Sequence, residues 1–178
     1  MPTVNIIRAQ PGHEEIIAHY FTDNAAHLKP WSPLVPKNHH SVDAWRRRLV
    51  ERELEFDAGL SAHFIGTDDS SGQMIGSCSL SNIVRGVFQA CHMGYSIAEK
   101  YEGQGCMKQI TEYAINYAFT ELKLHRIMAN YMPNNLRSEA LLQSLGFERE
   151  GYAKQYILIN GRWEDHVLTS LINPSDAR

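Results

Sequence analysis

The stretch Tyr101-Glu102-Gly103-Gln104-Gly105-Cys106-Met107 joins a predicted strand to a predicted helix, and it decides the fold assignment. A pair of glycines at such a junction lets the backbone turn tightly. Successive amide groups can then point into one concavity, and the helix that follows adds unsatisfied amides and the positive end of its dipole. The stretch therefore predicts a pyrophosphate site that needs no lysine.

Two familiar phosphate-binding motifs do not fit this stretch. The third glycine of the dinucleotide motif G-x-G-x-x-G is replaced by Lys108, and the P-loop pattern G-x-x-x-x-G-K-[ST] is not matched. A bare G-x-G before a helix is also a common turn. The loop therefore needs support from the rest of the chain.

Strands and helices are mixed along the chain, with no repeat and no low-complexity linker. Ser41 is a candidate cap for the second helix, a loop with three prolines spans 29–36, and Asn160-Gly161 is a strong hairpin signal. We expect one α/β domain, residues 1–178, with a single central sheet. Strands are predicted at 3–8, 61–67, 73–82, 88–97, 125–132, 152–159 and 163–172, and helices at 13–28, 42–56, 107–122 and 135–145.

Composition excludes several classes of function. The 178 residues carry a formal net charge of -3, which disfavours a general nucleic-acid binder. No apolar stretch approaches ~20 residues, so no membrane span is expected. The three cysteines form no C-x-x-C pair, which favours reduced thiols in a cytoplasmic protein, and no histidine spacing is typical of a metal site. The basic run 46–52 is interpreted as a solvated helix face, with ribosome contact as the alternative.

Three motifs together resemble the GNAT superfamily of N-acetyltransferases. They are the strand–Gly103-Gln104-Gly105–helix unit, Asn135-Leu136-Arg137-Ser138, and Leu145-Gly146-Phe147. The stretches 82–86, 94–97, 125–133, 150–154 and 165–169 are similar to the branch that acetylates ribosomal proteins. The resemblance implies a GNAT fold, with a mostly antiparallel sheet splayed in the middle and flanked by helices. It also implies acetyl-CoA as cosubstrate, no metal, and the N-terminal alanine of ribosomal protein S5 as acceptor.

The resemblance also implies where the cosubstrate lies. In this superfamily the pantetheine arm enters between two splayed strands, which here are 91–97 and 126–131, and the amide of Met93 or Gly94 could polarise the thioester carbonyl. The family loop pattern Q/R-x-x-G-x-G/A begins at Glu102, a departure that we expect to direct its carboxylate outward. The implied contacts are Met93, Gly94, Tyr95, Ser96, Ile97, Gly103, Gln104, Gly105, Cys106, Met107 and Asn135.

The family places an acid near the coenzyme sulfur at the position of Ser138, although this hydroxyl could instead bond within its own helix. His92 and Tyr131 are candidate catalytic groups, with ordinary packing as the alternative for each. An α-amine has a pKa near 8, so it needs little help to lose its proton.

The acceptor end of the site is predicted less sharply. Trp31 is a candidate wall for the peptide, or a lid over the core. Asp165 could hold the incoming ammonium, or it could be an exposed turn charge.

Other functions remain open from the sequence alone. The chain could acetylate a small amine or a lysine, and a pocket rich in carboxylates would then favour a polyamine. It could also be a non-catalytic module that binds acyl-CoA or the ribosome. The sequence does not distinguish a monomer from a homodimer.

Overall fold

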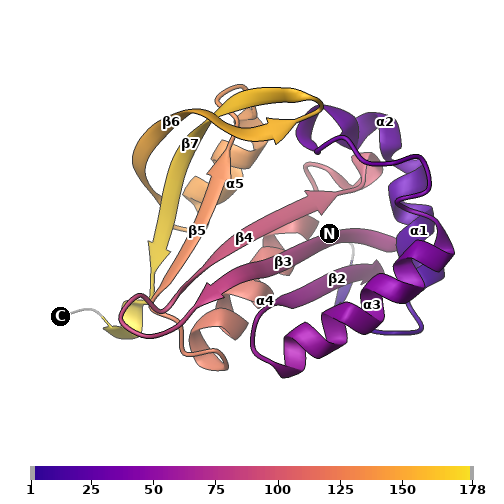
Figure 1. Ribbon diagram of the computed structural model, residues 1–178, viewed down its shortest axis with the longest axis horizontal. Coiled ribbons are helices and arrows are strands. Elements are labelled where there is room, and N and C mark those ends of the chain that lie inside the picture. Colours follow the sequence, from indigo (N-terminus) through magenta and orange to yellow (C-terminus); the bar gives the residue numbers. More distant parts are fainter. Residues whose placement is uncertain (1–2, 177–178) are drawn as a thin grey trace.

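A seven-stranded sheet organises the computed structural model, which describes residues 3–176 (Figure 1). The strand order is β1-β2-β3-β4-β5-β7-β6, and every pair is antiparallel except β4 with β5. This confirms the mixed α/β fold with a mostly antiparallel sheet. The strands are β1 (Val4–Arg8), β2 (Ala62–Asp68), β3 (Met74–Val84), β4 (Ala90–Ile97), β5 (Arg126–Tyr131), β6 (Glu148–Ile159) and β7 (Arg162–Ile172).

The sheet is splayed between its two parallel strands. β4 pairs with β5 only from Ala90↔Arg126 to His92↔Met128. Beyond His92 the two strands diverge, and the ribbons open like a V beneath the β6–β7 hairpin (Figure 1). Among the strands of the described part of the chain, none pairs with this edge of the second half of β4.

Helices cover both faces of the sheet (Figure 1). On α4, residues spaced by three and four are buried against β3 and its neighbours, which is the pattern of an amphipathic helix. On the other face α3 begins at its predicted cap, where Ser41 Oγ accepts from Ala44 N at 3.2 Å. No helix within residues 3–176 combines the length and apolarity that crossing a bilayer requires. The helices are α1 (Glu14–Asp23), α2 (Ala25–Leu28), α3 (Val42–Asp57), α4 (Cys106–Thr120) and α5 (Leu136–Ser144).

The predicted single helix over 13–28 is wrong, because the chain breaks at Asn24. The Asn24 side chain donates to Tyr20 O at 2.9 Å and accepts from Glu99 N at 3.1 Å, which ends α1 and ties it to the segment before the phosphate loop. The chain then forms the short helix α2, followed by a 3-10 turn, η1 (Lys29–Trp31), in the segment where only loop was expected. Further 3-10 turns are η2 (Glu99–Tyr101) and η3 (Pro174–Asp176).

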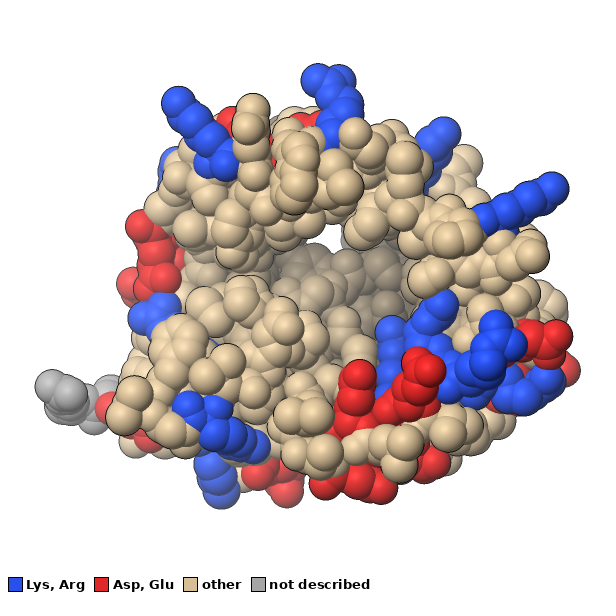
Figure 2. Space-filling view, in the orientation of Figure 1, with Lys and Arg blue, Asp and Glu red and all other residues tan. Residues whose placement is uncertain are grey.

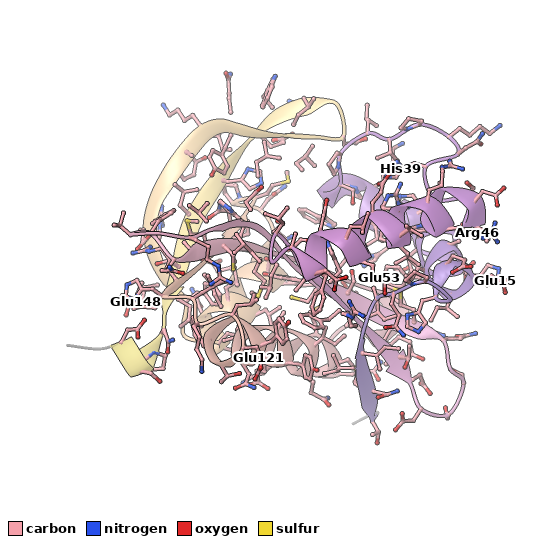
Figure 3. The ribbon with its side chains drawn as sticks, turned by 60° about the horizontal axis from the view of Figure 1, so that its bottom comes forward. Glu15, His39, Arg46, Glu53, Glu121 and Glu148 are labelled. Atoms are coloured by element: carbon pink, nitrogen blue, oxygen red, sulfur yellow. The ribbon has the colours of Figure 1, made fainter. Side chains whose placement is uncertain are left out.

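The basic run 46–52 lies on α3, and most of its arginines contact neighbouring side chains. Arg46 pairs with Glu14 at 3.6 Å, and the guanidinium groups of Arg48 and Arg52 lie 4.3 and 5.0 Å from the centre of the Trp45 ring. Figure 3 shows Arg46 at the periphery of the molecule, on the α1 and α3 side. Three of the four arginines of the run therefore contact side chains of α1 or α3, and Arg47 is exposed on the surface of α3.

Candidate active site

A cavity of about 420 Å³ lies where β4, the phosphate loop, α5 and the α2–η1 segment meet. It brings together residues that are more than a hundred positions apart in the chain. Nine of the residues predicted from the sequence line it: Trp31, Tyr95, Ser96, Ile97, Gly103, Gly105, Met107, Asn135 and Ser138.

The phosphate loop has the geometry of an anion site. Gly103 and Gly105 adopt φ values of 68° and 75°, a left-handed backbone that other residues take only with strain. The first amide of α4 with a backbone acceptor is that of Gln109, which donates to Gly105 O at 3.3 Å. Within residues 3–176 no acceptor is found for the amides of 103 to 108. These amides are therefore free to bind an anion at the positive end of the α4 dipole.

Two predicted loop residues are held by their side chains away from the cavity. Gln104 donates from Nε2 to Lys100 O at 2.6 Å, which fixes the loop to η2. Cys106 is fully buried in the core beneath α1 and α3, where burial raises the pKa of its thiol. Only the backbone of either residue can serve the ligand.

The open edge of β4 presents a regular set of backbone groups. Ala98 N donates to Ile75 O of β3 at 2.8 Å, and alternate residues of a strand direct their amides to the same edge. Gly94 and Ser96 therefore direct their amides to β3. Met93, Tyr95 and Ile97 direct theirs to the gap. Of the two amides predicted to polarise a carbonyl, the register favours that of Met93.

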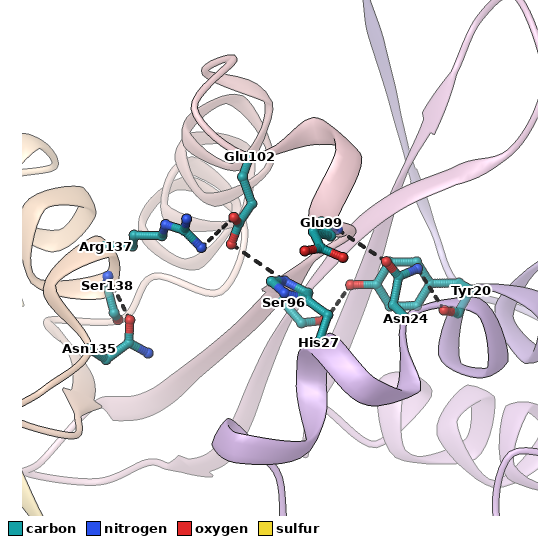
Figure 4. A network of polar contacts seen from close by, with 9 residues as sticks. All are labelled: Tyr20, Asn24, His27, Ser96, Glu99, Glu102, Asn135, Arg137 and Ser138. Atoms are coloured by element: carbon teal, nitrogen blue, oxygen red, sulfur yellow. Dashed lines mark hydrogen bonds and ion pairs between the residues drawn. The ribbon is translucent and has the colours of Figure 1, made fainter.

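Glu102 lies inside the cavity, so the prediction that its carboxylate points outward is wrong. Its side chain is 17% exposed and lies between the His27 imidazole, at 3.4 Å, and the Arg137 guanidinium, with which it forms an ion pair (Figure 4). An acidic group beside an anion site needs such compensation. The pairing joins α2, the phosphate loop and α5 across the cavity.

Ser138 lies at the start of α5, beneath β4. Asn135 caps this helix, since its Oδ1 accepts from Ser138 N at 3.1 Å (Figure 4). The Ser138 hydroxyl lies 2.5 Å from the hydroxyl of Tyr95. Within residues 3–176 it makes no bond to a carbonyl of its own helix, so the alternative proposed for this side chain is not realised.

His92 and Tyr131 do not line the cavity. His92 lies in the paired half of β4, where burial lowers the pKa of its ring. Tyr131 is buried and donates to Glu139 Oε1 at 3.1 Å. Neither side chain is placed to act on a group held between the loop and α5.

Asp165 is also occupied elsewhere. Its two oxygens accept from Tyr152 OH at 2.7 Å and from Gln155 N at 2.8 Å. Gln155 has a φ of 48° at an irregularity of β6, so the carboxylate serves to shape this hairpin.

The β6–β7 hairpin closes over the gap between β4 and β5. Figure 2 shows an opening through the molecule at the place where Figure 1 shows these two strands diverging. At the rim, Asn160 N donates to Ser32 O at 2.9 Å, and Leu34 packs against Gly161. The hairpin tip is thus joined to the segment that carries Trp31 and bridges the gap on this side.

Three groups at the site were missed by the sequence analysis: the His27 side chain, the Arg137 guanidinium and the Tyr95 phenol. Arg137 is part of the motif Asn135-Leu136-Arg137-Ser138, and the acidic Glu102 beside a phosphate site indicates that a cation lies nearby. His27 carried no such signal, because its place depends on the break at Asn24. Within the described residues no group of three or more His, Cys, Asp or Glu side chains could hold a metal ion.

Known proteins share this architecture. The acetyltransferase (GNAT) domain family matches residues 4–148. The ribosomal protein uS5-alanine N-acetyltransferase of Escherichia coli is 46% identical over 159 residues, which cover 89% of this chain and 81% of that protein.

Two solved structures extend the likeness to three dimensions. The ribosomal-protein-S5-alanine acetyltransferase of Vibrio fischeri superposes with a TM-score of 0.95 at 37% identity, covering 100% of this chain and 97% of that one. Mycobacterium smegmatis RimJ, in complex with a CoA-disulfide, superposes with a TM-score of 0.89 at 26% identity, covering 98% and 84%.

Proposed function

Because this chain belongs to the acetyltransferase (GNAT) domain family, we propose that it transfers the acetyl group of acetyl-CoA to the N-terminal α-amine of a protein, namely the N-terminal alanine of ribosomal protein S5. The observation that carries the proposal is the meeting of two features in one cavity. These are a loop of free amides at the start of α4 and an unpaired backbone edge on β4.

The residues of the cavity fit acetyl-CoA in both charge and shape. The amides of 103 to 108 suit a diphosphate, and Lys108 and Arg137 add positive charge nearby. The edge of β4 suits an amide-rich arm, which can pair with it as an added strand would. Acetyl-CoA supplies an activated thioester when it is bound, and the protein positions it.

The reaction has three requirements, and residues near the reacting end meet two of them. The amide of Met93 points to the gap and can donate to a developing oxyanion, an interaction worth roughly 3 kcal/mol in comparable sites. The Ser138 hydroxyl can donate its proton to the leaving sulfur, and a weak acid is enough here because a thiol has a pKa of about 8.5. An α-amine with a pKa near 8 can lose its proton to water, so no side-chain base is required.

The charge of the cavity favours a terminal amine over a polyamine. Among residues 3–176, Glu102 is the one carboxylate that lines it, and this group already contacts His27 and Arg137. A polyamine carries several positive charges and needs more than one free anion. The opening under the hairpin suits a slender chain end. For S5 in particular, the support is the named activity of the relatives.

The proposal is tested with a panel of acceptors and acetyl-CoA. Peptides that begin with the S5 N-terminal sequence, with Ala, Ser or Met at the first position, are compared with an N-blocked lysine peptide and spermidine. Thiol release gives the rate, and mass spectrometry gives the acetylated atom. We expect the Ala-terminal peptide to have the highest kcat/KM.

Two outcomes would contradict the proposal in different ways. Turnover of spermidine or of the lysine peptide alone would overturn the acceptor class and leave the acetyl transfer intact. Acetyl-CoA binding without thiol release in the presence of any amine would favour the non-catalytic binding module.

A further inference from the structure

One close polar contact in the cavity joins two hydroxyl groups. Tyr95 of β4 and Ser138 of α5 both line the cavity, and their oxygens lie 2.5 Å apart. They come from opposite walls, because β4 and α5 meet only across the splayed gap. The contact therefore sets the position of the Ser138 side chain relative to the strand that holds the thioester.

One of the two hydroxyls must donate in this contact. A phenol is the more acidic hydroxyl and the better donor, with an ordinary pKa near 10. Burial raises the pKa of Tyr95 further, so the phenol keeps its proton throughout the neutral range. With Tyr95 as donor, the hydrogen of Ser138 is left free to point into the cavity.

We propose that Tyr95 is a positioning residue for acetyl transfer: its phenol donates to Ser138 Oγ and thereby aims the Ser138 hydroxyl hydrogen at the leaving sulfur. This rests on the proposed function, and it assigns to Tyr95 a side-chain role beyond the backbone contact. Tyr95 acts through Ser138 and keeps its own proton.

The step balances without any further reactant. The amine nitrogen attacks the thioester carbon, a C–N bond forms, and the C–S bond breaks with its electron pair on sulfur. Sulfur takes the proton of Ser138, and Ser138 oxygen recovers one from the water that accepted the proton lost by nitrogen. One proton passes in net from nitrogen to sulfur.

The test is a double-mutant cycle on turnover. Ser138→Ala is expected to lower kcat about a hundredfold, the usual scale for loss of a general acid. Tyr95→Phe removes only the phenolic oxygen and is expected to lower kcat about tenfold, with KM for acetyl-CoA changed less than about twofold. If Tyr95 acts through Ser138, the double variant is no slower than Ser138→Ala alone.

Tyr20→Phe is the matched control. Tyr20 is a buried tyrosine that, like Tyr95, contacts a serine through its hydroxyl, which lies 2.8 Å from Ser96 Oγ of β4 (Figure 4). We expect a melting-temperature shift like that of Tyr95→Phe, with turnover kept. An equal loss of kcat in both variants would assign Tyr95 a merely structural role, and an additive double variant would show that it acts independently of Ser138.

A second variant keeps the proposal testable if Tyr95→Phe folds poorly. Replacing Tyr95 alone by 2,3,5-trifluorotyrosine preserves the ring and hydroxyl and lowers the pKa of the phenol far enough to offset the effect of burial and bring its titration into the pH range of the assay. A phenolate cannot donate, so kcat should fall at a lower pH than in the wild type, and an unchanged pH profile would overturn the proposal. Every variant is assayed with an amine that the wild type acetylates, so a wrong acceptor does not affect this test.

Discussion

Glu102 is the residue at which the predicted and observed sites differ most. It stands at the first position of the family loop pattern, and its carboxylate lies in the cavity beside the anion site. Arg137 is 76% exposed, so its ion pair with Glu102 contributes little to stability. Repulsion between Glu102 and the cosubstrate phosphates should therefore outweigh the loss of this pair.

We expect Glu102→Gln to tighten acetyl-CoA binding about threefold, because one negative charge near the diphosphate is removed. Titration calorimetry at low salt measures the change, and the difference should shrink as salt rises. Arg137→Gln is the matched variant of opposite sign and should weaken binding. If both variants weakened binding equally, the main task of Glu102 would be to hold Arg137.

At the scale of elements, the loop before α4 can be tested by a single substitution. Gly105 has φ 75° and ψ 0° at the N-cap of α4, in the middle of the amide-lined turn. Gly105→Glu adds both a side chain and a negative charge at this point, and we expect it to abolish acetyl-CoA binding. Calorimetry tests this directly.

Gly59→Glu controls for backbone strain and charge. Gly59 has φ 70°, no neighbour within 4 Å of an added methyl group, and lies at the end of α3 outside the cavity. This variant should lose a similar amount of stability and retain affinity. Unchanged affinity in Gly105→Glu would remove the loop from the binding site.

The hairpin tip is a second element with a local test. A methyl group added at Gly161 would lie 2.9 Å from Leu34 Cδ1, and the φ of 80° disfavours alanine by about 1 kcal/mol. Gly161→Ala should therefore loosen the tip, seen as faster hydrogen exchange of the Asn160 amide that donates to Ser32 O. Adding Leu34→Ala should restore part of the protection, whereas no recovery would show that backbone strain alone is responsible.

Elements with a regular spacing of apolar residues and with clear capping or turn residues at their ends were predictable from the sequence. α4 is one example, and the hairpin turn at Asn160-Gly161 is another. The break at Asn24 was not, because the apolar spacing of 13–28 continues across it and the cause is a contact with Glu99, 75 positions away. β6 begins at Glu148 and not at 152, since its pairing with β7 continues through irregularities that conceal the strand period.

At the scale of the whole molecule, the same limit applies to the site. The loop, the capping Asn135 and the position of Ser138 follow from local motifs, and the structure brings them into one cavity. The ion pairs of Glu102 and the Tyr95–Ser138 contact join segments that only the sheet topology brings together. Local sequence therefore predicts which groups are available, and the fold decides which of them meet.

The packing of α1, the 36–41 segment and α3 makes the stability of the whole molecule depend on pH. His40 is stacked on Phe21 with ring centres 4.2 Å apart, and burial, with charge from His39 and Arg48, lowers its pKa to about 4. Burial and the charge of Arg52 lower the pKa of His63 to about 3. Both pKa values lie below the ordinary 6.5, so the unfolded chain takes up protons first as the pH falls.

The free energy of unfolding should be highest above about pH 6.5, where both histidines are neutral in the folded and the unfolded chain. It should fall as the pH is lowered toward about 4, before most carboxylates titrate. Melting temperatures at pH 7 and pH 5 measure the decline. His40→Phe keeps the stack on Phe21 and has no group that titrates, so its melting temperature should fall less between pH 7 and pH 5. The difference should be about 2–4 °C for each kcal/mol that protonation of His40 costs the wild type. His19→Gln, at an exposed position, should retain the full decline. If His40→Phe declined as steeply as the wild type, protonation of His40 would have no part in the acid sensitivity, and the other buried imidazoles would have to account for it.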